Sequence, residues 1–325
     1  MGRSAKWIKD VHPSQPVSEV ACMALTFRLD AVAYYLPKAA ESAEDDIEYV
    51  HQLRVATRRS MAAVQMFQSL LPARRARKLR KMLGRLRRAA GAARDLDVLH
   101  ERLCKHAEQT SVPGMKKVLA KIVERREESQ WPLLEVHRRW KKKNCEKWVS
   151  QLLARVRWRS GNPEPSFEQS AAQALCAPVS EFFQAARADL DDIVALHRMR
   201  ICAKQLRYTM ELLAGAFASD FRERLYPTFT EVQEKLGAIN DCATAKRLFE
   251  NWAAAAKSGD AAVELNRMAA GELQQLDSVC GEFRQWWTPG RAGRLRKQFE
   301  PYLVHLDPNA TQANDRSDLP RATAL

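Results

Sequence analysis

The sequence predicts an all-α fold, and three observations support this prediction. Residues that favour helices, chiefly Ala, Leu, Arg, Glu, Lys and Gln, dominate the 325-residue chain. The chain has only 12 glycines, and many of its 14 prolines fall between segments with helical patterns. No run of alternating β-branched residues requires a strand.

Apolar residues recur at helical spacing along most of the chain, and turn-forming residues separate these patterns. We expect the segment at 113–156 to break at Pro132, because proline cannot donate the helical hydrogen bond. The helices predicted in chain order are residues 17–40, 46–70, 74–92, 95–109, 113–156, 167–190, 192–217, 220–238, 241–257, 259–286 and 290–304.

The helical patterns fall into two halves. The stretch RSGNPEPS at 159–166 has the composition of a linker, and it separates residues 15–158 from residues 167–305. Residues 1–14 form an N-terminal extension. The polar residues 306–325 have little to bury, so we expect a disordered tail.

The two halves contain similar sequences at a constant offset of 146 residues. VHQLRVATRR at 50–59 matches LHRMRICAKQ at 196–205, and GAARDLDVL at 91–99 matches GAINDCATA at 237–245. Two separated matches at one offset indicate an internal repeat. We therefore predict two related helical bundles packed about a pseudo-twofold axis.

The composition favours a polyanionic partner. The formal net charge is +14 and the isoelectric point is about 9.6, which suits nucleic acid, an anionic membrane or a phosphate polymer. The seven cysteines are scattered singly, which predicts free thiols in a reducing compartment. No cysteine and histidine set has the spacing of a zinc site, so we expect no metal and no cofactor. Without an apolar signal segment or a membrane-spanning stretch, the sequence predicts a soluble cytoplasmic protein.

Basic residues follow one face of a predicted helix in each half. His197, Arg200, Lys204 and Arg207 are spaced 3, 4 and 3 residues apart, which places them on one helical face. In the first half the same positions hold His51, Arg54, Arg58 and, in place of the last arginine, Met61.

The next helix of the first half carries a second basic stripe. Arg74, Lys78, Lys81, Arg85 and Arg88 are spaced 4, 3, 4 and 3 residues apart. From Tyr49 to Arg94 the chain has 13 Lys or Arg and no Asp or Glu. Like charges one turn apart destabilise a helix by about 0.2–0.5 kcal/mol each. A bound polyanion would offset this repulsion, and so would carboxylates from elsewhere in the fold.

Other polar and aromatic residues allow more than one interpretation. We predict that Asp95 and Asp241 cap the N-termini of helices; the alternative is that they orient an arginine such as Arg94. His51 and His197 suit hydrogen bonds to a phosphate or to the opposite half better than a metal ion. Trp140 and Trp148 lie among lysines, where they could stack on bases or pack between helices.

At VHQLRVATRR, LHRMRICAKQLRY and the RDLDVL and NDCATA segments, the sequence resembles the CHAD family, the conserved histidine α-helical domain proteins. The resemblance covers about residues 15–305. It implies two four-helix-type bundles around a basic channel that binds inorganic polyphosphate. The ligands that it implies are His51, Arg54, Arg58, Arg59, His197, Arg200, Lys204 and Arg207. The stripe on the next helix adds Lys78, Lys81, Arg85 and Arg88.

The sequence departs from the family pattern at several positions. Ser60 and Met61 follow the first arginine pair, and Gln205 stands where a second basic residue is common. Glu231 and Glu234 correspond to Arg85 and Arg88, so we expect an uneven distribution of charge between the halves.

The sequence favours binding over catalysis. Some relatives carry a triphosphate-tunnel catalytic domain, but its E-x-E-x-K motif is not found here. A stand-alone module implies polyphosphate binding without enzymatic activity, with tethering to polyphosphate granules as one use of it. A nucleic-acid-binding helical protein is the alternative, and an enzyme acting on polyphosphate is a third possibility. Neither a P-loop nor a carboxylate pair for Mg²⁺ near the basic face supports the enzyme.

Overall fold

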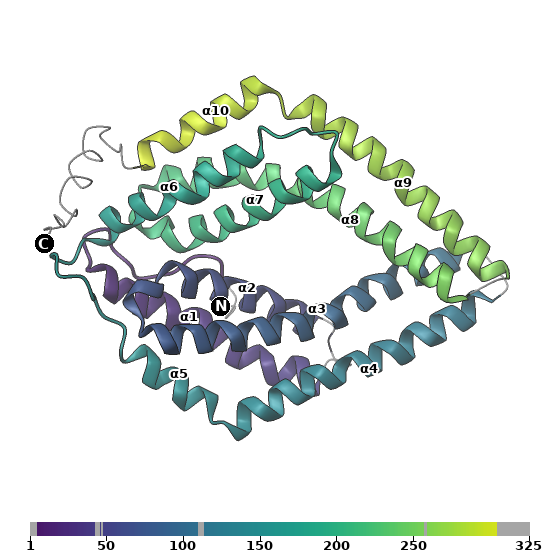
Figure 1. Cartoon of the computed structure of the whole chain (residues 1–325), viewed down its shortest axis with the longest axis horizontal. Coiled ribbons are helices and arrows are strands. Elements are labelled where there is room, and N and C mark those ends of the chain that lie inside the picture. Colours follow the sequence, from purple (N-terminus) through teal and green to yellow (C-terminus); the bar gives the residue numbers. More distant parts are fainter. Residues whose placement is uncertain (1–4, 43–45, 47, 110–113, 257–258, 304–325) are drawn as a thin grey trace, which may run out of the picture.

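The computed structural model describes residues 5–42, 46, 48–109, 114–256 and 259–303, and every regular element in these ranges is a helix (Figure 1). The all-α prediction is confirmed. The predicted tail at 306–325 lies outside the described residues. The longer helices are α1 (Val17–Glu41), α2 (Glu48–Met66), α3 (Ala73–Gln109), α4 (Met115–Lys142), α5 (Cys145–Leu153), α6 (Phe167–Ala185), α7 (Ile193–Leu213), α8 (Tyr226–Ala256), α9 (Asp260–Trp286) and α10 (Pro289–Phe299).

Helices α1 to α5 form one layer, and α6 to α10 form a second layer above it in Figure 1. Short helical turns complete the connections: η1 (Gln68–Leu70), η2 (Ala214–Ala216), η3 (Phe221–Leu225) and η4 (Glu300–Tyr302). Each layer has its own apolar core, one centred on side chains such as Leu53 and Leu79 and the other on Phe182 and Phe229. Between the layers, α2 lies against α7.

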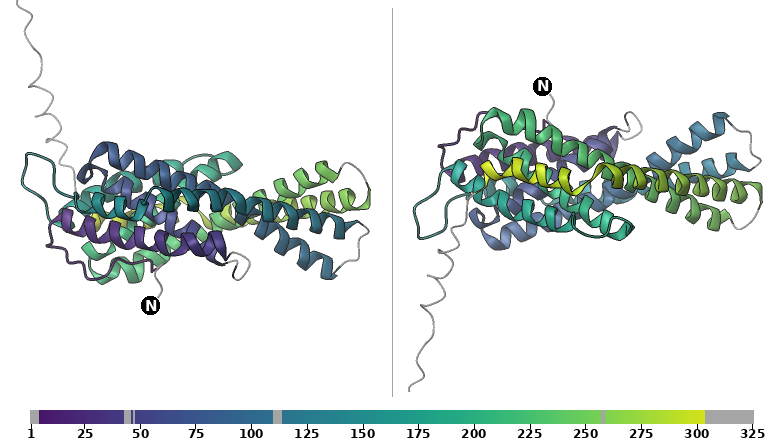
Figure 2. Two further views of the ribbon diagram at one scale, coloured as in Figure 1. Left: turned by 90° about the horizontal axis from the view of Figure 1, so that it is seen from below. Right: turned by 90° about the horizontal axis from the view of Figure 1, so that it is seen from above.

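The layers also meet at both ends of the molecule. At one end, Val17 N donates to Pro165 O (3.2 Å) and Phe167 N donates to Gln15 O (2.7 Å). At the other end, the last turns of α3 and α8 join the first turns of α4 and α9 in a third core, which includes Leu103 and Phe249. These four helix ends extend together beyond the rest of the molecule in Figure 2. The contacts at both ends of the molecule therefore fix the position of α2 relative to α7.

The predicted breaks near residues 93 and 239 are wrong. Helix α3 runs without interruption from Ala73 to Gln109, and α8 runs from Tyr226 to Ala256. The glycines at 91 and 237 cost each helix only about 1 kcal/mol relative to alanine, which the packing on both sides can offset. Asp95 and Asp241 consequently lie within helices, and the prediction that they cap helix N-termini is wrong.

The predicted break at Pro132 is also wrong. Helix α4 continues through this residue, and the chain turns instead at Asn144, which has a left-handed backbone conformation (φ 45°). Pro132 and Glu128 are exposed, so solvent can satisfy the carbonyl that loses its helical hydrogen bond. Buried Leu133 and Trp140 hold the following turns against the core.

Helix positions in the two halves correspond at the offset found in the sequence. Adding 146 to the bounds of α2 gives 194–212, close to α7, and adding it to α5 gives 291–299, close to α10. This correspondence is compatible with the internal repeat, which stays a prediction.

Candidate functional site

The two basic stripes meet between the layers. His51, Arg54 and Arg58 on α2 and His197, Arg200 and Lys204 on α7 all line a single cavity of about 480 Å³. These six residues occupy matching positions, 146 residues apart, on the two helices. Helical periodicity puts each set of three on one face, and the contact between α2 and α7 brings the two faces together.

A second cavity, of about 580 Å³, adjoins the first. Arg58, Arg200 and Lys204 line both cavities, and Arg87 of α3 joins them in the second. We refer to the two cavities together as the central groove. Seven cations and three carboxylates line it; the cations are Arg54, Arg58, Arg87, Arg102, Arg200, Lys204 and Arg247, and the carboxylates are Asp95, Glu181 and Asp241.

Asp95 positions an arginine of the central groove. Arg54 Nη1 lies 3.1 Å from Asp95 Oδ1 and also donates to the carbonyl of Gly91 at 3.2 Å. The alternative that this aspartate orients an arginine is therefore supported, with Arg54 as the partner; the side chain of Arg94 lies outside the described part of the structure. In the second half, the negative charge of Asp241 acts on Arg200 and Lys204.

The cations at the centre of the groove repel one another. Burial, followed by the positive charges of Arg200 and Arg58, lowers the pKa of Lys204 to about 7. Burial and the charge of Arg54 lower the pKa of Arg58 as well. The Arg200 guanidinium keeps a buried Nε without a hydrogen-bond partner among the described residues. An anion placed here would relieve the repulsion and accept hydrogen bonds.

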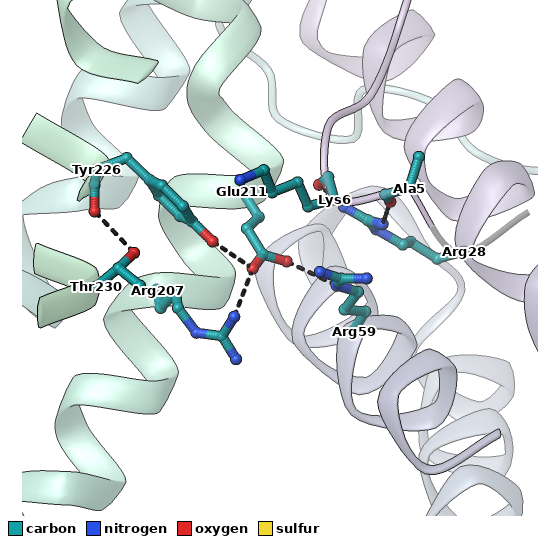
Figure 3. Close-up of polar contacts among 8 residues, drawn as sticks. All are labelled: Ala5, Lys6, Arg28, Arg59, Arg207, Glu211, Tyr226 and Thr230. Carbon is teal, nitrogen blue, oxygen red and sulfur yellow. Dashed lines mark hydrogen bonds and ion pairs between the residues drawn. The ribbon is translucent and has the colours of Figure 1, made fainter. Parts of the chain in front are cut away.

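Arg59 and Arg207 do not line the central groove. Figure 3 shows them on either side of Glu211, whose side chain is fully buried. Glu211 Oε2 accepts from Arg59 Nε at 2.7 Å, and Glu211 Oε1 accepts from Arg207 Nη1 at 3.0 Å and from the Tyr226 hydroxyl at 2.9 Å. The resemblance implies that both arginines are phosphate ligands, whereas the structure places them in this ionic network between the layers.

Arg28 extends the network towards the N-terminal segment. Its side chain is buried, and its two terminal nitrogens donate to the carbonyls of Ala5 (2.6 Å) and Lys6 (2.5 Å; Figure 3). Burial and the charge of Arg59 lower the pKa of Arg28 to about 10. Burial and the charge of Glu211 raise the pKa of Tyr226 to about 12. These groups join α1, α2, α7 and α8.

The four residues predicted on α3 lie away from the central groove. Lys78, Lys81 and Arg85 line a separate pocket against α4 and α5, and Arg88 is exposed and lines none of the described pockets. Arg87, which lies outside the predicted stripe of the same helix, lines the groove instead. The stripe spacing identified one face of α3, but it could not show which face turns towards α7.

No group of three or more His, Cys, Asp or Glu side chains that could hold a metal ion occurs in the described ranges. All seven cysteines are free thiols. Among the described helices, none is long and apolar enough to cross a membrane.

Comparisons with known proteins agree on the fold. No curated protein matches the sequence. The crystal structure of the CHAD domain from the plant Ricinus communis is similar over 86% of this chain and 95% of its own, with a TM-score of 0.67 and 20% identity. The structure of PptA from Streptomyces chartreusis is similar over 84% of this chain and 99% of its own, with a TM-score of 0.64 and 17% identity. The family model of the CHAD domain matches residues 23–250, and the chain therefore belongs to the CHAD domain family.

Proposed function

We propose that the protein binds inorganic polyphosphate in the central groove. One observation carries the proposal: α2 and α7, far apart in the sequence, bring His51, Arg54, Arg58, His197, Arg200 and Lys204 to one cavity. The resemblance to the CHAD family implies that all six of these residues are polyphosphate ligands.

The chemistry of the groove suits a chain of phosphates. Arginine side chains can hold two phosphate oxygens at once, and the histidines add further donors. The pKa of Lys204 is about 7 in the free protein, so its remaining neutral fraction would gain a proton as the anion approaches. Both cavities share Arg58, Arg200 and Lys204, so one polymer could pass from one cavity to the other.

The groove is less suited to nucleic acid. Base stacking needs an open aromatic face, but the lining aromatics are Phe249, which is buried, and Tyr208. The Arg207 guanidinium lies over the Tyr208 ring, 4.8 Å from its centroid. We therefore keep nucleic acid as the alternative and expect polyphosphate to displace single-stranded DNA at a lower phosphate concentration.

We propose binding without turnover. The two carboxylates in the α2–α7 cavity each have a cationic neighbour, since Asp95 pairs with Arg54 and Asp241 acts on Arg200. Such neighbours oppose the binding of Mg²⁺ between the carboxylates. Phosphate release from polyphosphate in the presence of Mg²⁺ would contradict this part of the proposal. Association with polyphosphate granules would follow from the same groove.

The double substitution Arg58→Gln/Lys204→Gln tests the site. It removes two cations shared by both cavities, and we expect polyphosphate affinity to fall about 100-fold, since each charged hydrogen bond contributes about 1.5–3 kcal/mol. Isothermal titration calorimetry at fixed ionic strength measures the change, because salt weakens all such binding.

The matched control is Arg138→Gln/Lys142→Gln, which makes the same change of charge on the exposed side of α4, outside the described pockets. We expect this control to bind within about threefold of the unmodified protein. Equal losses in the two variants would show that overall charge, and not the central groove, determines affinity.

A further inference from the structure

A second pocket lies on the other side of α3 from the central groove. Helices α3, α4 and α5 enclose a cavity of about 170 Å³, which shares no lining residue with the groove. We call it the outer pocket. Its lining residues are Lys78, Lys81, Met82, Arg85, Leu86, Val136, Arg139, Trp140, Lys143, Cys145 and Trp148.

The floor of the outer pocket is apolar. Leu86 is fully buried, and Trp140 and Cys145 each expose only 7% of their surface. Burial raises the pKa of the Cys145 thiol, so this side chain is neutral and acts as part of the apolar wall. A polyphosphate chain has no apolar group that could use such a floor.

The rim of the outer pocket is cationic. Lys78, Lys81, Arg85 and Lys143 have no ion-pair partner among the described residues, whereas Arg139 pairs with Glu135 on its own helix. The Nζ atom of Lys78 lies 4.6 Å from the ring centroid of Trp148, which draws this charge to the mouth of the cavity. The rim therefore offers several cations to one acidic group.

One buried donor in the outer pocket is unused. Trp140 is more than nine-tenths buried, and its indole Nε1 has no hydrogen-bond partner in the part of the chain that the structure describes. A buried N–H without an acceptor costs about 1–3 kcal/mol, so an indole usually finds a partner. Because Trp140 lines the cavity, its indole N–H group can report on a ligand that fills the outer pocket.

The corresponding place in the second half holds a pocket of about 250 Å³ with a different distribution of charge. A pocket there is lined by Trp286, Glu231 and Arg291, which stand 146 residues after Trp140, Arg85 and Cys145. The Arg291 guanidinium covers the Trp286 ring at 4.3 Å from its centroid, and Glu231 offsets the local positive charge. The outer pocket differs in that no carboxylate lines it, so its cations are not offset within the lining.

We infer that the outer pocket binds a small organic acid with an apolar body, either one aromatic ring or a short alkyl chain. An apolar protein cavity of about 150 Å³ is large enough for benzene, so the 170 Å³ here accommodates a body of that size. The acid group would meet Lys78, Lys81 and Arg85 at the rim. This site is independent of polyphosphate binding.

Calorimetry of the full chain with 4-phenylbutyrate tests the inference, with the neutral amide of the same acid as the comparison. We expect the acid to bind at least about tenfold more tightly than the amide, because the amide lacks the charge-assisted contacts. A ¹⁵N spectrum of the indole groups gives a second readout. The resonance that disappears in Trp140→Phe should shift when the acid binds.

Three variants locate the site. Met82→Trp fills the cavity, and Lys78→Gln/Arg85→Gln removes two exposed rim charges; each should weaken binding of the acid about tenfold or more. Arg291→Gln/Arg294→Gln makes the same charge change in the second half and should leave the affinity within about twofold. Thermal melting shows that each variant folds.

Four results would overturn the inference: undetectable binding of 4-phenylbutyrate, equal affinity for the amide, unchanged affinity in the folded Met82→Trp variant, or an unmoved Trp140 resonance. Unchanged polyphosphate affinity in Lys78→Gln/Arg85→Gln would support the separation of the two sites, and a loss equal to that of Arg58→Gln/Lys204→Gln would contradict it.

Discussion

At the residue scale, Lys204 would link the proposed polyanion binding to pH. Its pKa is about 7 in the free protein, because it is partly buried beside Arg58 and Arg200. A bound polyanion raises this pKa, so binding above neutral pH must include the uptake of a proton. His51 and His197 line the same cavity.

We predict that polyphosphate affinity falls as the pH rises from 6 to 8.5, and that proton uptake on binding increases between pH 6 and 8. Calorimetry in two buffers with different ionisation enthalpies measures this uptake. The variant Lys204→Arg keeps its charge at every pH in this range and should lose most of the uptake near pH 8. Unchanged uptake in this variant would assign the effect to other groups.

The same lysine destabilises the unbound protein. Its folded-state pKa of about 7 is below the ordinary lysine pKa of 10.5, so between these pH values the unfolded chain holds more protons than the folded chain. The free energy of unfolding therefore rises with pH between these two values. Below pH 7 Lys204 is charged in the folded protein, and its full destabilising effect is present.

We predict that Lys204→Met raises the melting temperature of the free protein at pH 7 by about 1–2 °C, which corresponds to roughly 1 kcal/mol in a chain of this size. The difference should narrow as the pH is raised from 7 towards 10. Differential scanning calorimetry without polyanion measures it, and a lower melting temperature in the variant at pH 7 would contradict the electrostatic argument.

At the scale of elements, buried Glu211 joins α2 to α7. Arg59 and Arg207 both pair with it, and Tyr226 donates to the same carboxylate. Removing one partner of a buried ionic network leaves the others uncompensated, at a cost of about 3–5 kcal/mol. The network thereby holds the two basic helices at the spacing that forms the central groove.

We predict that Glu211→Gln lowers the free energy of unfolding by about 3 kcal/mol or more, since both arginines stay buried without their counter-ion. Denaturation in urea measures the loss. The control is Glu101→Gln, which breaks an exposed pair with Lys105 on the same turn of α3 and should cost less than about 1 kcal/mol. Similar losses in the two variants would rule out a special role for the network.

The sequence predicts which residues share a face of α2 and of α7. It does not predict the residues from other helices that these faces contact. The spacing of His51, Arg54 and Arg58 predicts a shared face, because helical periodicity alone determines it. Arg59 lies one residue outside that stripe, and its partner Glu211 is 152 residues away in sequence. The one part of this network with a sequence signal is the salt bridge between Arg207 and Glu211, which have the i,i+4 spacing of an ion pair within one helix.

The sequence also does not predict the orientation of α3 about its own axis. Basic residues surround much of this helix, so its charge pattern does not show which side meets α7 and which side meets α4. The structure turns Arg87 to the groove and Arg85 to the outer pocket. Helices α3 and α8 continue through residues 93 and 239 because they pack against neighbouring helices. Local capping and glycine patterns in the sequence do not reveal this packing.

At the scale of the whole molecule, the two layers form one site from two sets of residues. The predicted all-α fold is confirmed, and Figure 1 shows α1 to α5 and α6 to α10 in two layers. Contacts at both ends of the molecule and the Glu211 network fix the distance between α2 and α7. A single polyphosphate chain would therefore meet cations from both layers at once.

The stoichiometry of polyphosphate binding tests this claim most directly. Calorimetric titration should give one chain per protein molecule, and Arg54→Gln/Arg58→Gln on α2 and Arg200→Gln/Lys204→Gln on α7 should each weaken that one site about 100-fold. Two independent sites per molecule, of which each variant removes only one, would contradict the account.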